Sequence, residues 1–244
     1  MSELRVPSLQ HLARNWRDDS KHICKLLVRL ALSPPTFNYN PLYSAVRDLL
    51  VLQIPFEQVA EGIRKGVKRE GVRNNLLAVL PLIRDHFASI APDFFQTVDR
   101  RYYPVGRGLM VPFEPPMIYG IGGQLYFPWF SFWRQNPLKD ERLSLFVTLV
   151  DEVILQDPDL DSARFEILDF SAASAKSPRR LCVTDARDVP RVDEARKIAM
   201  LQVFAEGYFA AVSELAGSRT SKPAQETQQE EHDSGEPGLF DLPK

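Results

Sequence analysis

Residues 117–133 read MIYGIGGQLYFPWFSFW, and this stretch decides the fold class. Two apolar runs rich in aromatic residues stand on either side of Gly122-Gly123, which is the pattern of two strands joined by a tight turn. Pro128 lies inside the second run and cannot donate a main-chain hydrogen bond, so we expect an edge position or a bulge there. The sequence therefore predicts a β-hairpin near the middle of the chain.

A second pair of strands is predicted farther along, over residues 165–170 (FEILDF) and 180–184 (RLCVT), with a Ser/Ala/Lys/Pro loop between them. Phe165 and Ile167 alternate with Glu166, so we expect the two apolar side chains to face the core and Glu166 to face water. Apolar residues at helical spacing predict a helix on either side of this pair. These two helices cover residues 140–156, with Asp140 as the N-cap, and 192–216, with Gly217 at the end.

The first ninety residues also have apolar side chains at helical spacing, and prolines or polar N-cap residues divide them into short segments. The predicted helices cover residues 9–16, 20–32, 41–50, 59–63 and 72–87. Helices and strands are thus partly segregated along the chain, which predicts an α+β fold. We expect a helical subdomain (1–92) packed on a small, mainly antiparallel sheet flanked by helices (93–217), followed by a disordered acidic tail (218–244).

Composition limits the functional classes. The chain has 244 residues, of which 44% are hydrophobic and 25% are charged, and its formal net charge is −2. This balance excludes a surface built wholly for phosphate backbones, although the first ninety residues are richer in Lys and Arg than in Asp and Glu. Two lone cysteines, the absence of a signal-peptide pattern and the absence of a long apolar run predict a cytoplasmic protein without a membrane segment.

Motifs for catalysis and for cofactors are missing. Gly120-Ile121-Gly122-Gly123 follows a predicted strand, but neither a Lys-Ser/Thr pair nor a helix follows it, so it matches neither the P-loop nor the dinucleotide-binding pattern. The four histidines are scattered, and no closely spaced Cys and His residues could bind zinc. We therefore expect no cofactor, no metal ion and no enzymatic activity.

One arrangement of carboxylates supports an alternative. The predicted helix–strand–strand–helix order over residues 140–216 resembles in outline the core of metal-dependent nucleases of the PD-(D/E)xK type. The resemblance implies metal-assisted phosphodiester hydrolysis by Glu166, Asp169 and Asp185. The lysine that completes this motif is missing from the strand, and Lys176 lies in the following loop. A half-buried structural strand explains the same residues.

Cations and aromatic rings are interleaved between residues 100 and 134. Such a mixture can contact phosphates and stack nucleic-acid bases, and the same rings can also form the core of a compact sheet. The sequence leaves both interpretations open. The candidate nucleic-acid-binding residues are Arg100, Arg101, Arg107 and Arg134.

The end of the chain provides the third candidate site. Residues 236–242 read EPGLFDL and follow a segment rich in Gln and Glu. This pattern resembles the clamp-binding peptides of bacterial replication and repair proteins, which place a glutamine shortly before a Leu-Phe pair; here Glu236 stands at the glutamine position. The resemblance implies that Leu239, Phe240 and Leu242 fill an apolar pocket of a protein partner, with a sliding clamp as one candidate.

These observations predict a non-enzymatic interaction or accessory protein of a DNA-related assembly, which recruits its partner through the C-terminal peptide. A divergent nuclease and a nucleic-acid-binding module built on the Arg/aromatic segment are the alternatives.

Overall fold

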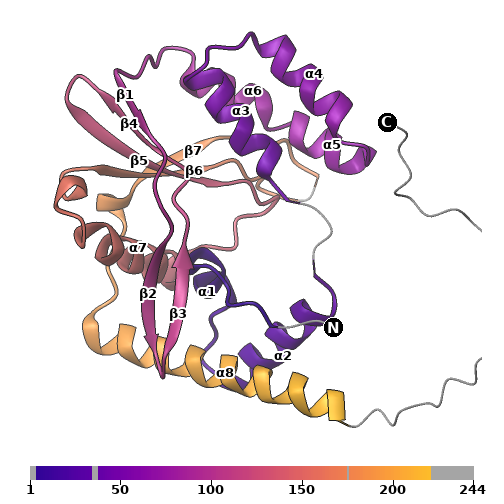
Figure 1. The fold of residues 1–244 in the computed structure, drawn as a ribbon, viewed down its shortest axis with the longest axis vertical. Coiled ribbons are helices and arrows are strands. Elements are labelled where there is room, and N and C mark those ends of the chain that lie inside the picture. Colours follow the sequence, from indigo (N-terminus) through magenta and orange to yellow (C-terminus); the bar gives the residue numbers. More distant parts are fainter. Residues whose placement is uncertain (1–3, 35–37, 175, 221–244) are drawn as a thin grey trace, which may run out of the picture.

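The computed structural model describes residues 4–34, 38–174 and 176–220 of the chain (Figure 1). It confirms the α+β class, with a mixed five-stranded sheet, a separate two-stranded hairpin and helices on both faces of the sheet. Leu239, Phe240 and Leu242, together with nearly all of the predicted tail, lie outside the described residues.

The five-stranded sheet has the order β1-β4-β5-β6-β7. Its strands are β1 (Phe94–Gln96), β4 (Ile118–Ile121), β5 (Gln124–Ser131), β6 (Arg164–Asp169) and β7 (Cys182–Asp185). Both predicted strand pairs are confirmed, because β4 and β5 pair antiparallel, as do β6 and β7. Gly122 and Gly123 form the first turn with φ angles of 55° and 83°, which glycine adopts without steric cost. β5 and β6 pair in parallel, so the sheet is mainly antiparallel with one parallel step.

Pro128 lies in β5, which is an inner strand of the sheet. Antiparallel pairing joins Tyr119–Ile121 of β4 to Gln124–Tyr126 of β5, and Pro128 lies beyond this pairing. At Pro128 the strand pairs with β6, where its register partner is Glu166. The proline therefore stands where β5 has a partner on one side, which is the local equivalent of an edge.

The two-stranded hairpin was not predicted from the sequence. It consists of β2 (Arg101–Gly106) and β3 (Leu109–Phe113), which pair antiparallel. The two turn residues, Arg107 and Gly108, both have positive φ angles of 53° and 79°, as in a type I′ turn. Pro104 and Pro112 obscured the strand pattern, and a two-stranded sheet tolerates them because each strand has one free edge.

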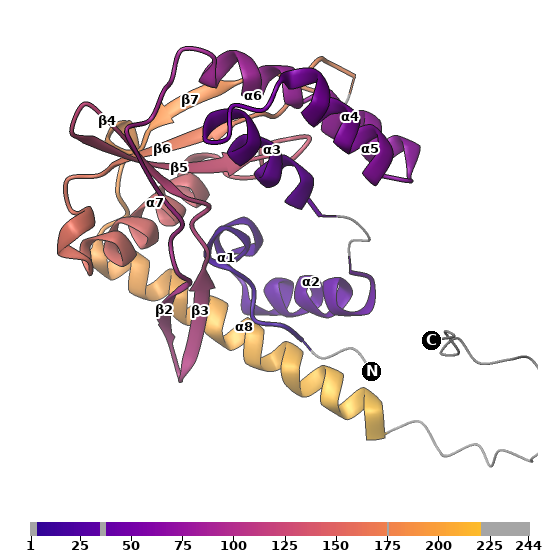
Figure 2. The ribbon, with the colours of Figure 1, turned by 45° about the horizontal axis from the view of Figure 1, so that its top comes forward.

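Helices cover both faces of the five-stranded sheet (Figures 1 and 2). One side contains the β2–β3 hairpin with α1 (Leu9–Asn15), α2 (Ser20–Leu32), α7 (Asp140–Leu155) and α8 (Glu194–Thr220). The other side contains α3 (Asn40–Leu50), α4 (Phe56–Gly66), α5 (Glu70–Leu77) and α6 (Leu80–Phe87). Each side has its own apolar core, so the helices of the first ninety residues are divided between the two faces.

Three helix boundaries differ from the prediction. The expected helix over residues 72–87 is divided into α5 and α6, because Pro81 in the first turn of α6 has no N–H for a continuous helix. Asp140 is the first helical residue of α7 with a φ of 49°, and Lys139 precedes it as the N-cap. Gly217 does not end α8, which continues to Thr220, because Gly217 does not adopt the left-handed conformation of a terminating glycine. Short 3-10 turns at Pro158–Leu160 and Ala186–Asp188 complete the fold.

Helix α8 is the longest described element. Residues Glu194–Gly217 have the length and apolar composition that a membrane-spanning helix needs. In the structure α8 packs along α2 and contacts β2. The approach to α2 is close at Gly207, where a Cβ atom would lie 2.7 Å from Ile23 Cβ and 2.7 Å from the Ser20 carbonyl oxygen.

Candidate functional site

The structure does not bring the three carboxylates of the nuclease hypothesis together. Glu166 of β6 stands opposite Asp185 of β7, whereas Asp169 stands opposite Cys182. Successive side chains of a strand point to opposite faces of the sheet, so Glu166 and Asp169 lie on different faces. Among the described residues, no group of three or more His, Cys, Asp or Glu side chains is placed to hold a metal ion.

Glu166 was expected to face water, and this expectation is wrong. Its side chain is buried because its face of β6 also carries Leu168 and belongs to the second apolar core. Burial raises the pKa of Glu166 despite the nearby Arg164, whose Nε lies 3.5 Å from the carboxylate. Asp185 accepts hydrogen bonds from Arg187 and Arg164, which lower its pKa to about 2. These two carboxylates therefore belong to an ion-pair network between β6 and β7.

Asp169 lies at the carboxyl end of β6 and organises a loop. It accepts hydrogen bonds from Asn136 Nδ2 at 2.9 Å, from the Ser171 N–H at 3.1 Å and from the Ser171 hydroxyl at 3.0 Å. These contacts tie the segment after β5 to the segment after β6.

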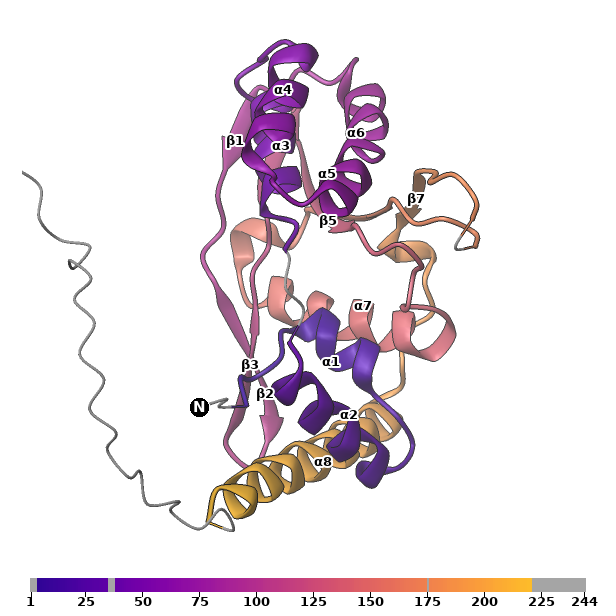
Figure 3. The ribbon, with the colours of Figure 1, turned by 90° about the vertical axis from the view of Figure 1, so that its right-hand side faces the viewer.

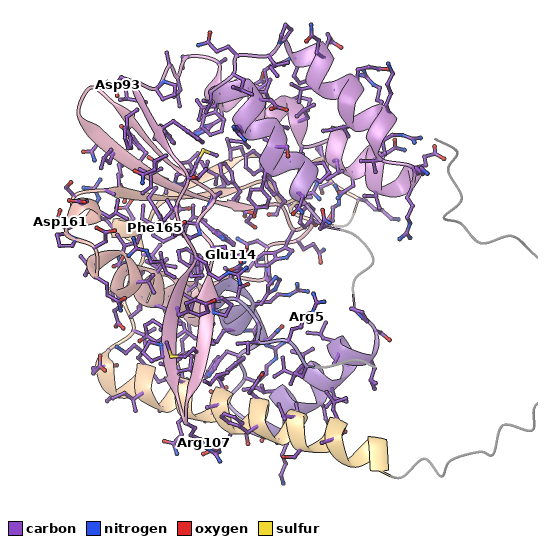
Figure 4. All side chains as sticks on the ribbon, in the orientation of Figure 1. Arg5, Asp93, Arg107, Glu114, Asp161 and Phe165 are labelled. Carbon is purple, nitrogen blue, oxygen red and sulfur yellow. The ribbon has the colours of Figure 1, made fainter. Side chains whose placement is uncertain are left out.

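The four predicted nucleic-acid-binding arginines are dispersed rather than gathered on one surface. Arg107 lies at the tip of the β2–β3 hairpin, whereas Arg134 follows β5 (Figure 4). Each has a different partner: Arg100 pairs with Glu114, Arg101 with Asp157 at 2.5 Å, Arg107 stacks on the Phe209 ring at 5.0 Å and Arg134 donates to the Ser177 carbonyl oxygen at 2.7 Å. The structure therefore commits each of these cations to a local contact.

Most aromatic rings of β5 and of the residues just after it belong to the cores, whereas Tyr102 of β2 is exposed. Trp129 and Phe127 belong to one apolar core, and Phe130 and Phe132 belong to the other. All four are at most 4% exposed. Base stacking needs exposed ring faces, so these rings do not provide it.

Helix α2 presents a cationic groove that the sequence analysis did not identify. One face of α2 packs on α8 through Ile23 and Leu27, which are buried. The opposite face lines an open groove of about 560 Å³. The lining residues of this groove are Arg17, His22, Lys25, Leu26 and Arg29.

A cluster of three arginines continues this groove toward α7. Arg17 Nη1 donates to the carbonyl oxygens of Arg14 at 3.1 Å and Trp16 at 2.6 Å, which fixes the guanidinium at the end of α1. Partial burial, and then the positive charges of Arg142 and Arg14, lower the pKa of Arg17. The three guanidinium groups therefore lie close enough to repel one another.

Two carboxylates near this cluster, Glu141 and Asp18, are bound by Arg196. Arg196 binds Glu141 through two hydrogen bonds of 2.7 and 2.9 Å, and it also contacts Asp18 at 3.3 Å. Within residues 4–34, 38–174 and 176–220, the remaining cations of this region form no ion pair with a carboxylate. These cations are Arg14, Arg17, Lys25, Arg29 and Arg142, and we refer to them together as the basic groove.

A polar cleft of about 700 Å³ adjoins the basic groove. It lies at the first turn of α7 and at the carboxyl end of the parallel pair β5–β6, where Ser131 and Asp169 are register partners. Ligands of sheets with parallel strands bind at this end, and a helix N-terminus favours anions. Arg142 lines the cleft, and its positive charge acts on Arg17, which lines the α2 groove. Figure 3 shows α1 and α2 on the same side of the five-stranded sheet as α7.

The signal for part of this site was present in the sequence. Lys21, Lys25 and Arg29 recur every four residues on the polar face of α2, which places them along one line. Arg142 could not be assigned to the same site, because only tertiary packing of α1 on α7 brings it near Arg17.

The comparisons with known proteins add no relative: no family model matches the chain, and no curated protein sequence matches it.

Proposed function

We propose that this chain is a non-enzymatic accessory protein that binds nucleic-acid phosphates in the basic groove and recruits a protein partner through its C-terminal peptide. The observation that carries the first half is the group of cations in the basic groove, which form no ion pair with a carboxylate among the described residues. Like charges held together in a folded protein repel one another, and a bound polyanion relieves that repulsion.

The shape of this group favours a polymer over a single small anion. Lys25 and Arg29 lie one helical turn apart, Arg17 lines the same groove, and the charges of Arg14 and Arg142 act on Arg17. A nucleic-acid strand carries its charges in a comparable line. The buried aromatic rings leave the groove without a stacking platform, so we expect contacts to the phosphate backbone with little dependence on base sequence.

The experiment is a titration of the full chain with a labelled DNA duplex and with its single strand, followed by fluorescence anisotropy. We expect binding at about 50 mM salt that weakens steeply as salt increases, because phosphate contacts release counterions. The reversal variant Arg17→Glu/Lys25→Glu/Arg29→Glu should bind at least about tenfold more weakly, with a salt slope smaller by about 2–3.

The matched control is Lys65→Glu/Arg84→Glu/Arg187→Glu, which changes the net charge equally at exposed, ion-paired positions outside the basic groove. An equal loss in both triple variants would contradict a specific groove. A loss confined to Arg100→Glu/Arg134→Glu would favour the alternative module in the middle segment.

The second half of the proposal rests on the resemblance of residues 236–242 to clamp-binding peptides. Leu239→Ala/Phe240→Ala should abolish binding to a purified bacterial sliding clamp while leaving DNA binding unchanged, because apolar anchors dominate such contacts. Equal binding by the wild type and the double variant would remove the peptide from the proposal. Metal-dependent DNA cleavage that Asp169→Ala abolishes would replace the whole proposal with the nuclease alternative.

A further inference from the structure

The chain carries both members of an electrostatic pair. One is the basic groove, whose cations have no carboxylate partner in the described part of the chain. The other is the segment 221–244, which contains six carboxyl side chains and two lysines. We infer that this acidic segment occupies the basic groove of its own chain when nucleic acid is absent. The inference concerns regulation of the basic groove. The contact between segment and groove does not depend on the proposed function, whereas its effect on nucleic-acid binding does.

The segment begins near α2, on the face that packs on α8, and the groove lies on the opposite face of the same helix. The later turns of α8 lie against α2, because Gly207 contacts Ser20 and Ile23, and Cys24 Sγ lies 3.4 Å from Glu214 Oε2 (Figure 2). α8 ends at Thr220, so the chain leaves the fold next to the helix that carries Lys25 and Arg29. A tether that starts near its target loses little freedom on binding.

The length of the segment is sufficient. Its 24 residues span at most roughly 80 Å when extended, and the groove follows α2, whose 13 residues are about 20 Å long. The carboxylates of Glu226, Glu230, Glu231 and Asp233 stand six to thirteen residues after Thr220. Such short tethers hold a ligand at an effective concentration of about millimolar, so weak contacts suffice for occupancy.

Three carboxylates of the folded body near the groove already have partners. Glu141 and Asp18 are bound by Arg196, whose pKa they raise, and Asp19 pairs with His22. A carboxylate-rich peptide offers several anions in a line and matches the line of cations. Competition follows, because phosphates and the segment cannot neutralise the same side chains at once.

The consequence is coupling between the two partners of the proposed function. A protein that binds Leu239 and Phe240 would withdraw the segment from the groove and thereby strengthen nucleic-acid binding. By linkage, nucleic acid would strengthen binding of that protein by the same factor.

The experiment compares two full-length variants with the wild type. The test variant is Glu226→Gln/Glu230→Gln/Glu231→Gln/Asp233→Asn. The control is Glu57→Gln/Asp159→Asn/Asp161→Asn/Asp188→Asn, which removes as many exposed carboxylates from outside the basic groove and its neighbouring segment. Figure 4 shows Asp161 on the edge of the molecule opposite Arg5.

The first measurement is the amide NMR spectrum of α2 without nucleic acid. At about 50 mM salt, the α2 amides should shift in the test variant and not in the control. Wild type at about 0.5 M salt should resemble the test variant, because salt screens the contact. Identical α2 amides in the wild type and the test variant would overturn the inference.

The second measurement is DNA affinity. Neutralising the segment should raise affinity about three- to tenfold at about 50 mM salt, and the gain should disappear as salt increases. Shifts of the α2 amides without DNA binding by any variant would uphold the inference and remove the nucleic-acid function. If the test variant binds DNA through the groove as the wild type does and its α2 amides are unchanged, the inference is overturned and the nucleic-acid function stands.

Discussion

Aromatic rings pack on both sides of the five-stranded sheet: the Phe130 and Phe132 centroids lie 5.6 Å apart on the side of α3–α6, and the Trp129 and Phe146 centroids lie 4.7 Å apart on the other side. The two sides differ in how charged groups contribute. On the side of α7 and α8, charged groups join remote segments within the apolar core. Lys197 of α8 contacts Glu152 of α7 at 2.5 Å, and Glu152 accepts a hydrogen bond from the Tyr103 hydroxyl of β2.

The difference follows from where the segments lie in the sequence. α3–α6 are consecutive, so short connections bring their apolar stripes together. The other side combines elements from both ends of the described chain, and directional charge pairs fix their register more specifically than apolar contacts do. The same side carries the basic groove, whose cations form no ion pair with a carboxylate in the described part of the chain, near Arg196, which forms two. We therefore expect the side of α3–α6 to contribute stability alone. We expect the side of α7 and α8 to contribute stability and also the proposed binding surface.

The largest effect should come from removing the buried guanidinium that joins α5 to the segments after β5 and β6. Arg179 is 6% exposed, and its guanidinium donates to the Phe132, Trp133 and Phe170 carbonyl oxygens and to Asn75 Oδ1 of α5. Arg179→Met should lower the free energy of unfolding by about 4 kcal/mol, because it leaves these buried acceptors without a donor. Chemical denaturation measures this change.

Arg84→Met is the control, because Arg84 is exposed and paired with its neighbour Asp85. It should change stability by less than about 0.5 kcal/mol. If Arg179→Met costs no more than this control, the hydrogen bonds of Arg179 do not stabilise the fold.

The second prediction compares one glycine from each side. Gly207→Ala should cost about 2–3 kcal/mol, since the added Cβ would lie 2.7 Å from Ile23 Cβ and the Ser20 carbonyl oxygen and would separate α8 from α2. Gly62→Ala in α4 meets no atom within 4 Å and should stabilise by about 0.5–1 kcal/mol through helix propensity. Thermal unfolding of both variants measures the contrast. Stabilisation by both substitutions would contradict the close packing of α8 on α2.

The third prediction tests the charged network directly. Lys197→Met should cost about 2 kcal/mol, because the lysine is buried and its loss leaves Glu152 without its cation. Burial opposes the lysine's charge, but hydrogen bonds to Glu152 and Glu194 outweigh it and raise the pKa of Lys197. The stabilisation that the Lys197 charge provides is therefore fully present below the pKa of about 10.5 that lysine has in the unfolded chain. It should be constant between neutral pH and about pH 9. Denaturation at several pH values measures it.

A double variant sharpens this test. Adding Glu152→Gln to Lys197→Met should recover part of the loss, because the uncompensated carboxylate is then removed. Additive costs of the two substitutions would show that the side chains do not interact.

The sequence predicted what depends on local pattern. The turn at Gly122-Gly123, the strand pair around residues 165–184 and the N-terminal helices follow from periodicity and turn residues, and the structure confirms them. The parallel pairing of β5 with β6 and the division of the N-terminal helices between two faces depend on packing between distant segments. Periodicity carries no information about those contacts.

The candidate site was harder to predict for the same reason. The clustered arginines between residues 100 and 134 are close in sequence, yet each folds against a different neighbour. Arg142 is far in sequence from Arg14 and Arg17, yet it lies near Arg17 because α1 packs on α7. Spacing identifies a line of cations along α2, but only the fold shows which cations have carboxylate partners.

The smallest effect should be a pH dependence of the free energy of unfolding, which comes from His11 of α1. Burial, and then the charge of Arg14, lower the pKa of His11 to about 4 from its ordinary value of 6.5. The unfolded chain therefore takes up a proton between about pH 6.5 and 4 while the folded chain does not, so stability falls through this window by about 2 kcal/mol as pH decreases. Denaturation at several pH values should show a shallower decline for His11→Gln than for the wild type.

His22→Gln is the control for this slope, because His22 is exposed and paired with Asp19. Glu166 acts in the opposite direction, since burial raises the pKa of its carboxyl and folding then favours proton uptake. Glu166 is present in all three proteins, so its contribution cancels when their slopes are compared. Parallel pH profiles for the wild type and His11→Gln would show that His11 is protonated equally in the folded and unfolded states. In that case the repulsion among the cations around Arg14 would not reach His11, and the contrast between the two sides would be confined to α2, α7 and α8.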